Sequence, residues 1–133
     1  MSGGTTGDPA NPLEQALAVM DAYIGALNRS DEAAANAACH FPHVRLAGGK
    51  VTVWQKKGDY RLADFRARAG DGWARSQWDE RTPIHVGPDK VHLKVEFSRW
   101  RKDGSLIGRY KTIYIVTRQE GRWGIQARSS FAA

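Results

Sequence analysis

The stretch that decides the fold is the last third of the chain, residues 90–131, with the sequence KVHLKVEFSRWRKDGSLIGRYKTIYIVTRQEGRWGIQARSSF. It contains three long strand patterns, namely Lys90–Trp100, Leu106–Arg118 and Arg122–Phe131. The dipeptides Asp103-Gly104 and Glu120-Gly121 separate them, and short turns of this kind predict antiparallel neighbours. The C-terminal third therefore predicts a β-meander.

More strands precede this stretch. A fourth long strand pattern, Ala74–Val86, leads into the turn Gly87-Pro88-Asp89. Further upstream, His43–Ala47 and Lys50–Trp54 flank Gly48-Gly49, which is a two-residue hairpin signal. The sequence therefore predicts one hairpin followed by four meandering strands.

The N-terminal part predicts a long helix. Asn11 is a capping residue, and Pro12 suits the first helical position. Apolar residues then recur every three or four positions, as on one face of a helix: Leu13, Leu17, Met20, Ile24 and Leu27. This stripe predicts a helix packed against the core.

Two shorter helices follow. Ser30-Asp31-Glu32 opens the second, which ends near His40 because Phe41-Pro42 breaks a helix. The third covers Asp59–Arg68 and is closed by Gly70.

This order of elements predicts an α+β fold. A strongly curved, cone-shaped mixed or antiparallel sheet wraps around the N-terminal helices, and its open end can hold a pocket. Residues 1–10 are rich in Gly and Thr and are expected to be a flexible leader. Residues 11–133 are expected to form a single domain, which suits a chain of 133 residues.

Composition excludes several classes of protein. The hydrophobic fraction of 41% supports a packed core, and a single cysteine excludes an intramolecular disulfide and a multi-cysteine zinc site. The sequence contains no run of 18 apolar residues and no secretory signal pattern. We therefore expect a cytoplasmic protein without a membrane span.

The net charge of +6 is unevenly distributed. Residues 1–44 contain five acidic residues and one basic residue, whereas the rest contains 19 basic and 9 acidic residues. The later basic residues are spaced singly, as on strands with one solvated face: Lys94, Arg99, Arg109, Lys111, Arg118, Arg122 and Arg128. No nucleic-acid motif accompanies them, so a nucleic-acid partner is not expected.

One segment predicts a partner subunit. Ile113-Tyr114-Ile115-Val116 does not alternate between apolar and polar residues, so both faces of this strand are expected to be covered. Trp100 adds an aromatic residue beside the polar Ser98 and Glu96. We expect a homodimer formed through the outer sheet face, since such an apolar patch favours aggregation on a monomer.

Three segments resemble the nuclear transport factor 2-like superfamily, in its SnoaL-like and ketosteroid-isomerase-like branch. They are the helix end Ala26-Leu27-Asn28-Arg29-Ser30-Asp31, the hairpin His43-Val44-Arg45-Leu46-Ala47-Gly48-Gly49 and the final strand Glu120-Gly121-Arg122-Trp123-Gly124-Ile125. The resemblance covers residues 12–131, and the chain is similar to uncharacterised bacterial members of this branch. It implies a cystatin-like fold with a hydrophobic pocket, but this fold hosts both enzymes and non-catalytic adaptors.

The resemblance also implies where a catalytic base would lie. Ketosteroid-isomerase-like members place a carboxylate around the first hairpin, where this sequence offers His43 and no acid. A histidine can act as a base near neutral pH, so His43 is the catalytic candidate. Strand alternation opposes it, because Val44 and Leu46 are assigned to the core face and leave His43 on the other. A bulge near Pro42 would reverse this assignment.

Other ionisable residues are weaker candidates. Asp79 and Glu80 are adjacent, so on a regular strand they point to opposite faces. Glu96 is expected at solvent or at a dimer surface. His85 and His92 flank a turn and can approach each other, but two histidines without a carboxylate do not define a metal site. We expect no metal and no cofactor.

Aromatic residues predict the ligand site. Trp54, Trp73 and Trp78 bracket the third helix, and Tyr23 lies on the first. Tryptophan suits pocket mouths, although it also fills wide gaps under loops. We expect a hydrophobic or aromatic ligand near these residues and His43.

Two functions remain open at this point. One is a small-molecule-binding SnoaL-like domain that acts as a cofactor-independent isomerase, cyclase or dehydratase. The alternative is a non-catalytic ligand-binding or dimerisation module. The sequence does not decide whether the chain is an enzyme.

Overall fold

The computed structural model describes residues 11–133, so the predicted flexible leader lies outside the described residues. The helices are α1 (Pro12–Asn28), α2 (Glu32–Ala37) and α3 (Leu62–Ala69). The strands are β1 (Cys39–Ala47), β2 (Lys50–Trp54), β3 (Trp73–Val86), β4 (Lys90–Arg101), β5 (Leu106–Gln119) and β6 (Arg122–Ser130). No helix in residues 11–133 combines the length and the hydropathy needed to cross a bilayer.

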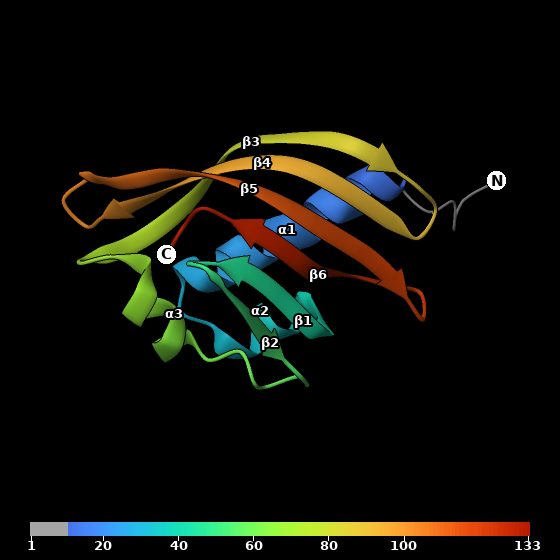
Figure 1. Cartoon of the computed structure of the whole chain (residues 1–133), viewed down its shortest axis with the longest axis horizontal. Helices are drawn as coiled ribbons and strands as arrows, with labels where there is room; N and C mark the ends of the chain where they lie inside the picture. The colour runs from blue at the N-terminus through green and yellow to red at the C-terminus, as the bar shows by residue number, and fades with distance from the viewer. Residues whose placement is uncertain (1–10) are drawn as a thin grey trace.

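All six strands form one sheet in the order β2-β1-β6-β5-β4-β3. Neighbouring strands are antiparallel except β1 and β6, which run parallel. The sheet is strongly curved and arches over α1, with α3 at one end (Figure 1). This confirms the predicted α+β class with a curved, mixed sheet.

The strands of the four-stranded meander are confirmed to within one residue, because turn glycines mark their ends. The hairpin at Gly48-Gly49 is also confirmed, but its first strand begins four residues before the predicted His43. The predicted end of the second helix near His40 is wrong. Helix α2 ends at Ala37, and β1 begins at Cys39, which pairs with Ile125 of β6. A contact with a strand more than 80 residues away leaves no local signal in the sequence.

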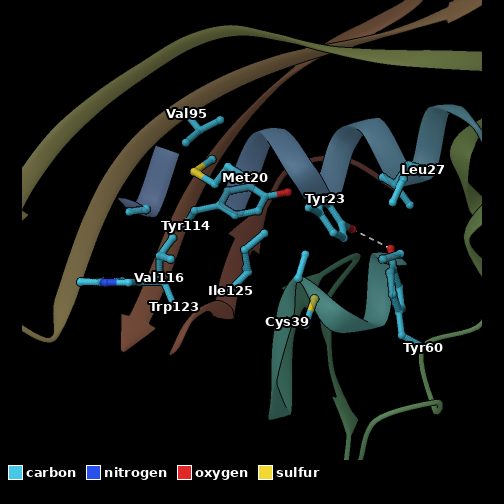
Figure 2. Close-up of a cluster of buried hydrophobic side chains, with 14 of the residues drawn as sticks. Met20, Tyr23, Leu27, Cys39, Tyr60, Val95, Tyr114, Val116, Trp123 and Ile125 are labelled. Carbon is cyan, nitrogen blue, oxygen red and sulfur yellow. Dashed lines mark hydrogen bonds between the residues drawn. The ribbon is translucent and has the colours of Figure 1, made fainter. Parts of the chain in front are cut away.

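Helix α1 forms as predicted. The side chain of Asn11 accepts a hydrogen bond from the Glu14 amide at 2.8 Å, which caps the helix. The buried line runs through Ala16, Met20, Tyr23 and Leu27, so the core face is rotated slightly from the predicted stripe. Figure 2 shows this line packed against the inner sheet residues, which include Val95, Tyr114, Val116 and Ile125.

The predicted facing of β1 is wrong. His43 and Arg45 point into the molecule with 2% and 6% of their surface exposed, whereas Leu46 is 46% exposed. The prediction assigned apolar residues to the core face. Here the outer face is itself apolar, since Val51 and Val53 of β2 are also exposed. Polarity therefore does not distinguish the two faces of this strand.

Candidate functional site

A cavity of about 30 Å³ lies between α1 and the concave face of the sheet. It has room for one or two water molecules. Its apolar lining comes from α1, α3, β3, β4 and the end of the chain: Ile24, Leu27, Phe65, Trp78, Phe97 and Ala132. Tyr23 and Tyr114 add hydroxyl groups. The cavity thus combines an aromatic wall with polar groups.

Four arginines from four different elements line this cavity. They are Arg45 of β1, Arg68 of α3, Arg99 of β4 and Arg128 of β6. Three of them are buried, and Arg68 is half-buried. The guanidinium groups of Arg68, Arg99 and Arg128 lie over aromatic rings, as Arg99 does over Phe97 at 5.5 Å, and such contacts offset part of the cost of burying a charge.

A tyrosine pair lies beside Arg128. The Tyr23 and Tyr60 hydroxyl oxygens are 2.7 Å apart, as the dashed line in Figure 2 marks. Arg128 Nη1 donates to the Tyr23 hydroxyl at 2.7 Å. The Tyr23 hydroxyl can in turn donate to Tyr60, so the three side chains form one hydrogen-bonded chain.

The two tyrosines of this hydrogen-bonded chain differ in the direction of their pKa shifts. Burial raises the pKa of Tyr23 well above its ordinary value, against the opposing effect of Arg128. Burial also raises the pKa of Tyr60, but the charges of Arg128 and Arg68 and the hydrogen bond with Tyr23 outweigh it and lower that pKa. Tyr60 is therefore the member of the pair that loses its proton first.

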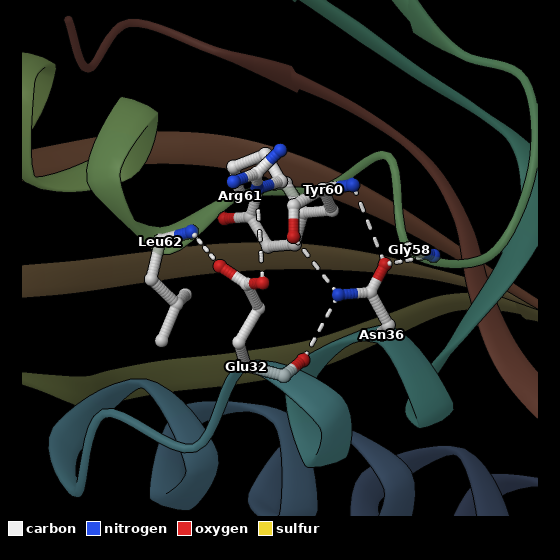
Figure 3. A network of polar contacts seen from close by, with 6 residues as sticks. All are labelled: Glu32, Asn36, Gly58, Tyr60, Arg61 and Leu62. Carbon is white, nitrogen blue, oxygen red and sulfur yellow. Dashed lines mark hydrogen bonds and ion pairs between the residues drawn. The ribbon is translucent and has the colours of Figure 1, made fainter.

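A polar network fixes the main chain at Tyr60 (Figure 3). The buried Asn36 side chain donates to the Tyr60 carbonyl oxygen at 2.8 Å and accepts from the Gly58 amide at 2.9 Å. Glu32 accepts from the Leu62 amide at 2.9 Å and forms an ion pair with Arg61. Helix α2 thus holds the loop that carries Tyr60 toward the cavity.

His43 lies next to the cavity but does not line it. Its ring packs against Trp54 with centroids 5.5 Å apart, and Nδ1 lies 2.8 Å from the Ile125 carbonyl oxygen. A carbonyl only accepts, so Nδ1 carries the proton. Burial, together with the charge of Arg128, lowers the pKa of His43 to about 3, so the ring is neutral at pH 7.

Of the four other residues predicted to contact a ligand, two line the cavity and two do not. Tyr23 and Trp78 line the cavity, and the Trp78 indole donates to the Met20 carbonyl oxygen at 3.2 Å. Trp54 lies behind the lining, against Tyr60 and Arg128. Trp73 does not line the cavity itself, but it packs on Phe65 and donates to Ser76, which both do. Their contact with a ligand stays a prediction.

Comparison with known proteins assigns a family. The model of the family described as NTF2-like protein (DUF6841) matches residues 14–130. The chain belongs to this NTF2-like family. Membership confirms the predicted resemblance to the nuclear transport factor 2-like superfamily.

Solved structures show the same fold. A protein of unknown function with a cystatin-like fold from Nostoc punctiforme has a TM-score of 0.72 and 13% identity, covering 91% of this chain and 90% of that one. A ketosteroid isomerase-like protein from Erwinia carotovora atroseptica has a TM-score of 0.61 and 18% identity, covering 90% and 95%. The search of curated proteins gave no match. At these identities the similarity establishes the fold alone.

The weaker acid–base candidates of this NTF2-like chain lie outside the cavity. Asp79 pairs with Arg109 at 3.4 Å, and Glu80 pairs with Lys94 at 3.5 Å. Glu96 lines a groove on the outer face. His85 and His92 approach each other, with their Nδ1 atoms 3.2 Å apart, but no group of three metal-binding side chains exists in residues 11–133.

Sequence reasoning missed Tyr60 and the four cavity arginines. The prediction that Arg99 and Arg128 belong to solvated faces is wrong, since they are 3% and 5% exposed. Simple alternation would have found Arg99, which continues the inward series of β4 that ends with Val95 and Phe97. Arg128 gave no such signal, because the pairing of β6 with β5 shifts by one residue before it.

Proposed function

We propose that this NTF2-like chain binds a small molecule whose hydrophobic or aromatic body contacts the aromatic side chains that line the cavity under α1. The observation that carries the proposal is the cavity itself, which combines aromatic walls with buried donors that lack a partner. The side-chain atoms Arg128 Nη2, Arg99 Nε and Arg68 Nε are buried without a hydrogen-bond partner. Buried polar groups are otherwise nearly always paired, so a ligand that accepts hydrogen bonds supplies what the fold lacks.

A cavity-filling variant tests this proposal. Ile24 lines the cavity, and Ile24→Trp should fill it and abolish the binding of small aromatic compounds. Val19 lies on the same helix, is half-buried and is absent from the lining, so Val19→Trp is the matched control and should keep binding. Titration monitored by the fluorescence of the tryptophans reports binding directly. Equal binding by both variants would place the ligand elsewhere.

A second candidate function is acid–base catalysis of the isomerase, cyclase or dehydratase type. The Tyr23–Tyr60 pair favours it, because one hydroxyl with a lowered pKa lies 2.7 Å from another that lines the cavity. His43, the base candidate from the sequence, is neutral and has a buried Nε2 without a partner. Tyrosine and histidine side chains can transfer a proton to or from a substrate without a cofactor.

Deuterium exchange distinguishes catalysis from binding. An enolisable aromatic ketone such as phenylacetone should exchange its acidic C–H protons for deuterium faster in the presence of the protein. Tyr60→Phe and His43→Ala should each lower this rate by about a hundredfold or more if the residue transfers the proton. A ketone that binds without accelerated exchange leaves the non-catalytic binding function and removes the catalytic one.

Other expectations from the sequence remain proposals. They are the SnoaL-like branch, the cytoplasmic location, the homodimer and the lack of a nucleic-acid partner. The last of these is supported by the placement of four arginines in the cavity and of several others in surface ion pairs, which leaves fewer basic groups free on the surface.

A further inference from the structure

The four arginines of the cavity have no acidic partner. In the part of the chain that the structure describes, no Asp or Glu side chain forms an ion pair with Arg45, Arg68, Arg99 or Arg128. The acidic residues that do pair are bound to other basic residues on the surface, as Asp79 is to Arg109. Within residues 11–133, no Asp or Glu side chain therefore neutralises the positive charge under α1.

The donors of these arginines are only partly used. Arg45 donates to the Ala132 carbonyl oxygen at 3.1 Å, and Arg99 donates to the main-chain oxygen of Ala133 at 3.2 Å. Arg128 uses Nη1 on Tyr23, while its Nη2 is buried with no partner. At least one strong, directional donor therefore remains free in the cavity.

This arrangement opposes stability. A buried charge without a counter-charge costs several kcal/mol, and like charges in one cavity repel. Burial and the charges of Arg68, Arg128 and Arg99 lower the pKa of Arg45 to about 10, so it still carries its charge at pH 7. Neutral residues of similar size would pack at a lower cost, so the cluster is better explained by a ligand than by folding.

We propose that the ligand carries an oxyanion, either a carboxylate or a phosphate group, that binds between Arg128 and Arg99 while its apolar body contacts Trp78 and Phe97. The guanidinium fork matches both groups, and charge-assisted hydrogen bonds to them are among the strongest in proteins. This inference rests on the proposed binding function and specifies the chemical class of its ligand.

The size of the cavity agrees with an oxyanion as the deepest part of the ligand. About 30 Å³ admits one or two waters or a group of similar size, but not an aromatic ring. The apolar body must therefore lie outside this small volume, against aromatic side chains of the lining such as Trp78 and Phe97. The unpaired Arg128 Nη2 and Arg99 Nε would donate to the oxyanion, and the bonds from Arg45 and Arg99 to the main-chain oxygens of Ala132 and Ala133 would remain.

A matched series of small molecules tests the charge requirement. Phenylacetate, phenyl phosphate, neutral phenylacetamide and inorganic phosphate are titrated by calorimetry into the full chain in a low-chloride buffer. We expect at least one of the two organic anions to bind about tenfold or more tightly than phenylacetamide, as one charge-assisted hydrogen bond allows. The stronger of the two identifies the carboxylate or the phosphate as the preferred group. Inorganic phosphate binding as tightly as phenyl phosphate would overturn the role of the apolar body.

Variants of the cavity arginines then test whether the anion binds at these residues. Arg99→Met and Arg128→Met should each reduce the affinity for the preferred anion about tenfold or more, while the affinity for phenylacetamide changes little. Arg109→Met is the matched control, since Arg109 is half-exposed and outside the cavity, and it should change neither affinity. If Arg128→Met does not fold, Arg99→Met decides.

The outcomes separate this inference from the proposed function. Equal affinities for phenylacetate, phenyl phosphate and phenylacetamide would overturn the oxyanion and leave small-molecule binding intact. Binding of none of the four compounds would overturn both. Tight anion binding that Arg109→Met abolishes and Arg99→Met leaves unchanged would place the anion on the surface and overturn the assignment to this cavity.

Discussion

At the residue scale, the main feature of the candidate site is that three strand arginines point into the molecule. Arg45, Arg99 and Arg128 are strand residues of the kind that usually points to water, yet each is turned toward the concave face. Around them Tyr23, Tyr60 and His43 form a buried polar group without a carboxylate. Burial and positive charge shift the pKa values of all three, and such perturbed groups gather at functional sites more often than elsewhere.

His43 predicts a pH dependence of stability. Its pKa is about 3 in the folded chain and about 6.5 in the unfolded chain, so protonation favours unfolding. Its contribution is complete above pH 6.5 and is lost as the pH falls toward 3. At pH 5 the loss amounts to about 2 kcal/mol.

Urea unfolding measures this effect. The free energy of unfolding should fall more steeply between pH 7.5 and pH 5 in the wild type than in His43→Gln, by about 2 kcal/mol over that interval. Carboxylates titrate in both proteins and cancel in the difference. Parallel pH profiles would show that the His43 ring is solvated or charged in the folded chain.

Among the elements, the shortest helix has the largest positioning role. Helix α2 contains only six residues, but Asn36 binds the main chain at Tyr60, in the segment between β2 and α3, and Glu32 binds the amide of Leu62, the first residue of α3 (Figure 3). That segment carries Tyr60 into contact with Tyr23. A local helix thus sets the geometry of a side-chain pair whose members are 37 residues apart.

Removal of the Asn36 amide should destabilise the fold strongly. Asn36→Ala deprives the carbonyl oxygen and the amide of Tyr60 of their partner, and buried unpaired groups cost about 1–3 kcal/mol each. We expect a loss of about 3 kcal/mol in urea unfolding. Asn11→Ala removes one exposed cap of α1 and should cost only about 1 kcal/mol. Similar losses in the two variants would contradict the positioning role of α2.

At the scale of the whole molecule, part of the outer sheet face, on β1, β2 and β5, exposes apolar side chains. Leu46, Val51, Val53 and Ile113 are each at least 42% exposed on β1, β2 and β5. Tyr114 and Val116 point inward while Ile113 is exposed, so the apolar run on β5 has residues on both faces, and the expected cover of its outer face by a partner subunit stays a prediction. The aromatic Trp100 instead lies beneath the Arg75 and Arg109 guanidinium groups, which shield its ring.

A homodimer through this outer face is the corresponding prediction. Light scattering at micromolar concentration should give twice the mass of one chain. Ile113→Glu places a charge in the apolar face and should give a monomer, whereas Val86→Glu, at the end of β3, should leave the dimer intact. A monomeric mass for the wild type would contradict this interface.

The sequence by itself determined the order of the elements, the turns and the fold family. These depend on local rules: Asn11 caps a helix, Gly48-Gly49 closes a hairpin, and the dipeptides at residues 103 and 120 separate long strands. Tyr23 was predicted to lie near a ligand and does line the cavity, but the predicted apolar stripe of the first helix left it out and the sequence did not indicate its partner Tyr60.

Only the tertiary structure decided which charged residues meet. The parallel pairing of β1 with β6 turned His43 and Arg45 inward, and a one-residue shift in β6 did the same for Arg128. Neither event has a local cause. The first depends on the pairing of strands more than 80 residues apart, and the second depends on a bulge in the pairing of β6 with β5. Strand alternation predicts a face only when one face is apolar and the other polar. At β1 and β2 the outer face is apolar while His43 and Arg45 point inward, so alternation could not show which charged residues lie around the cavity.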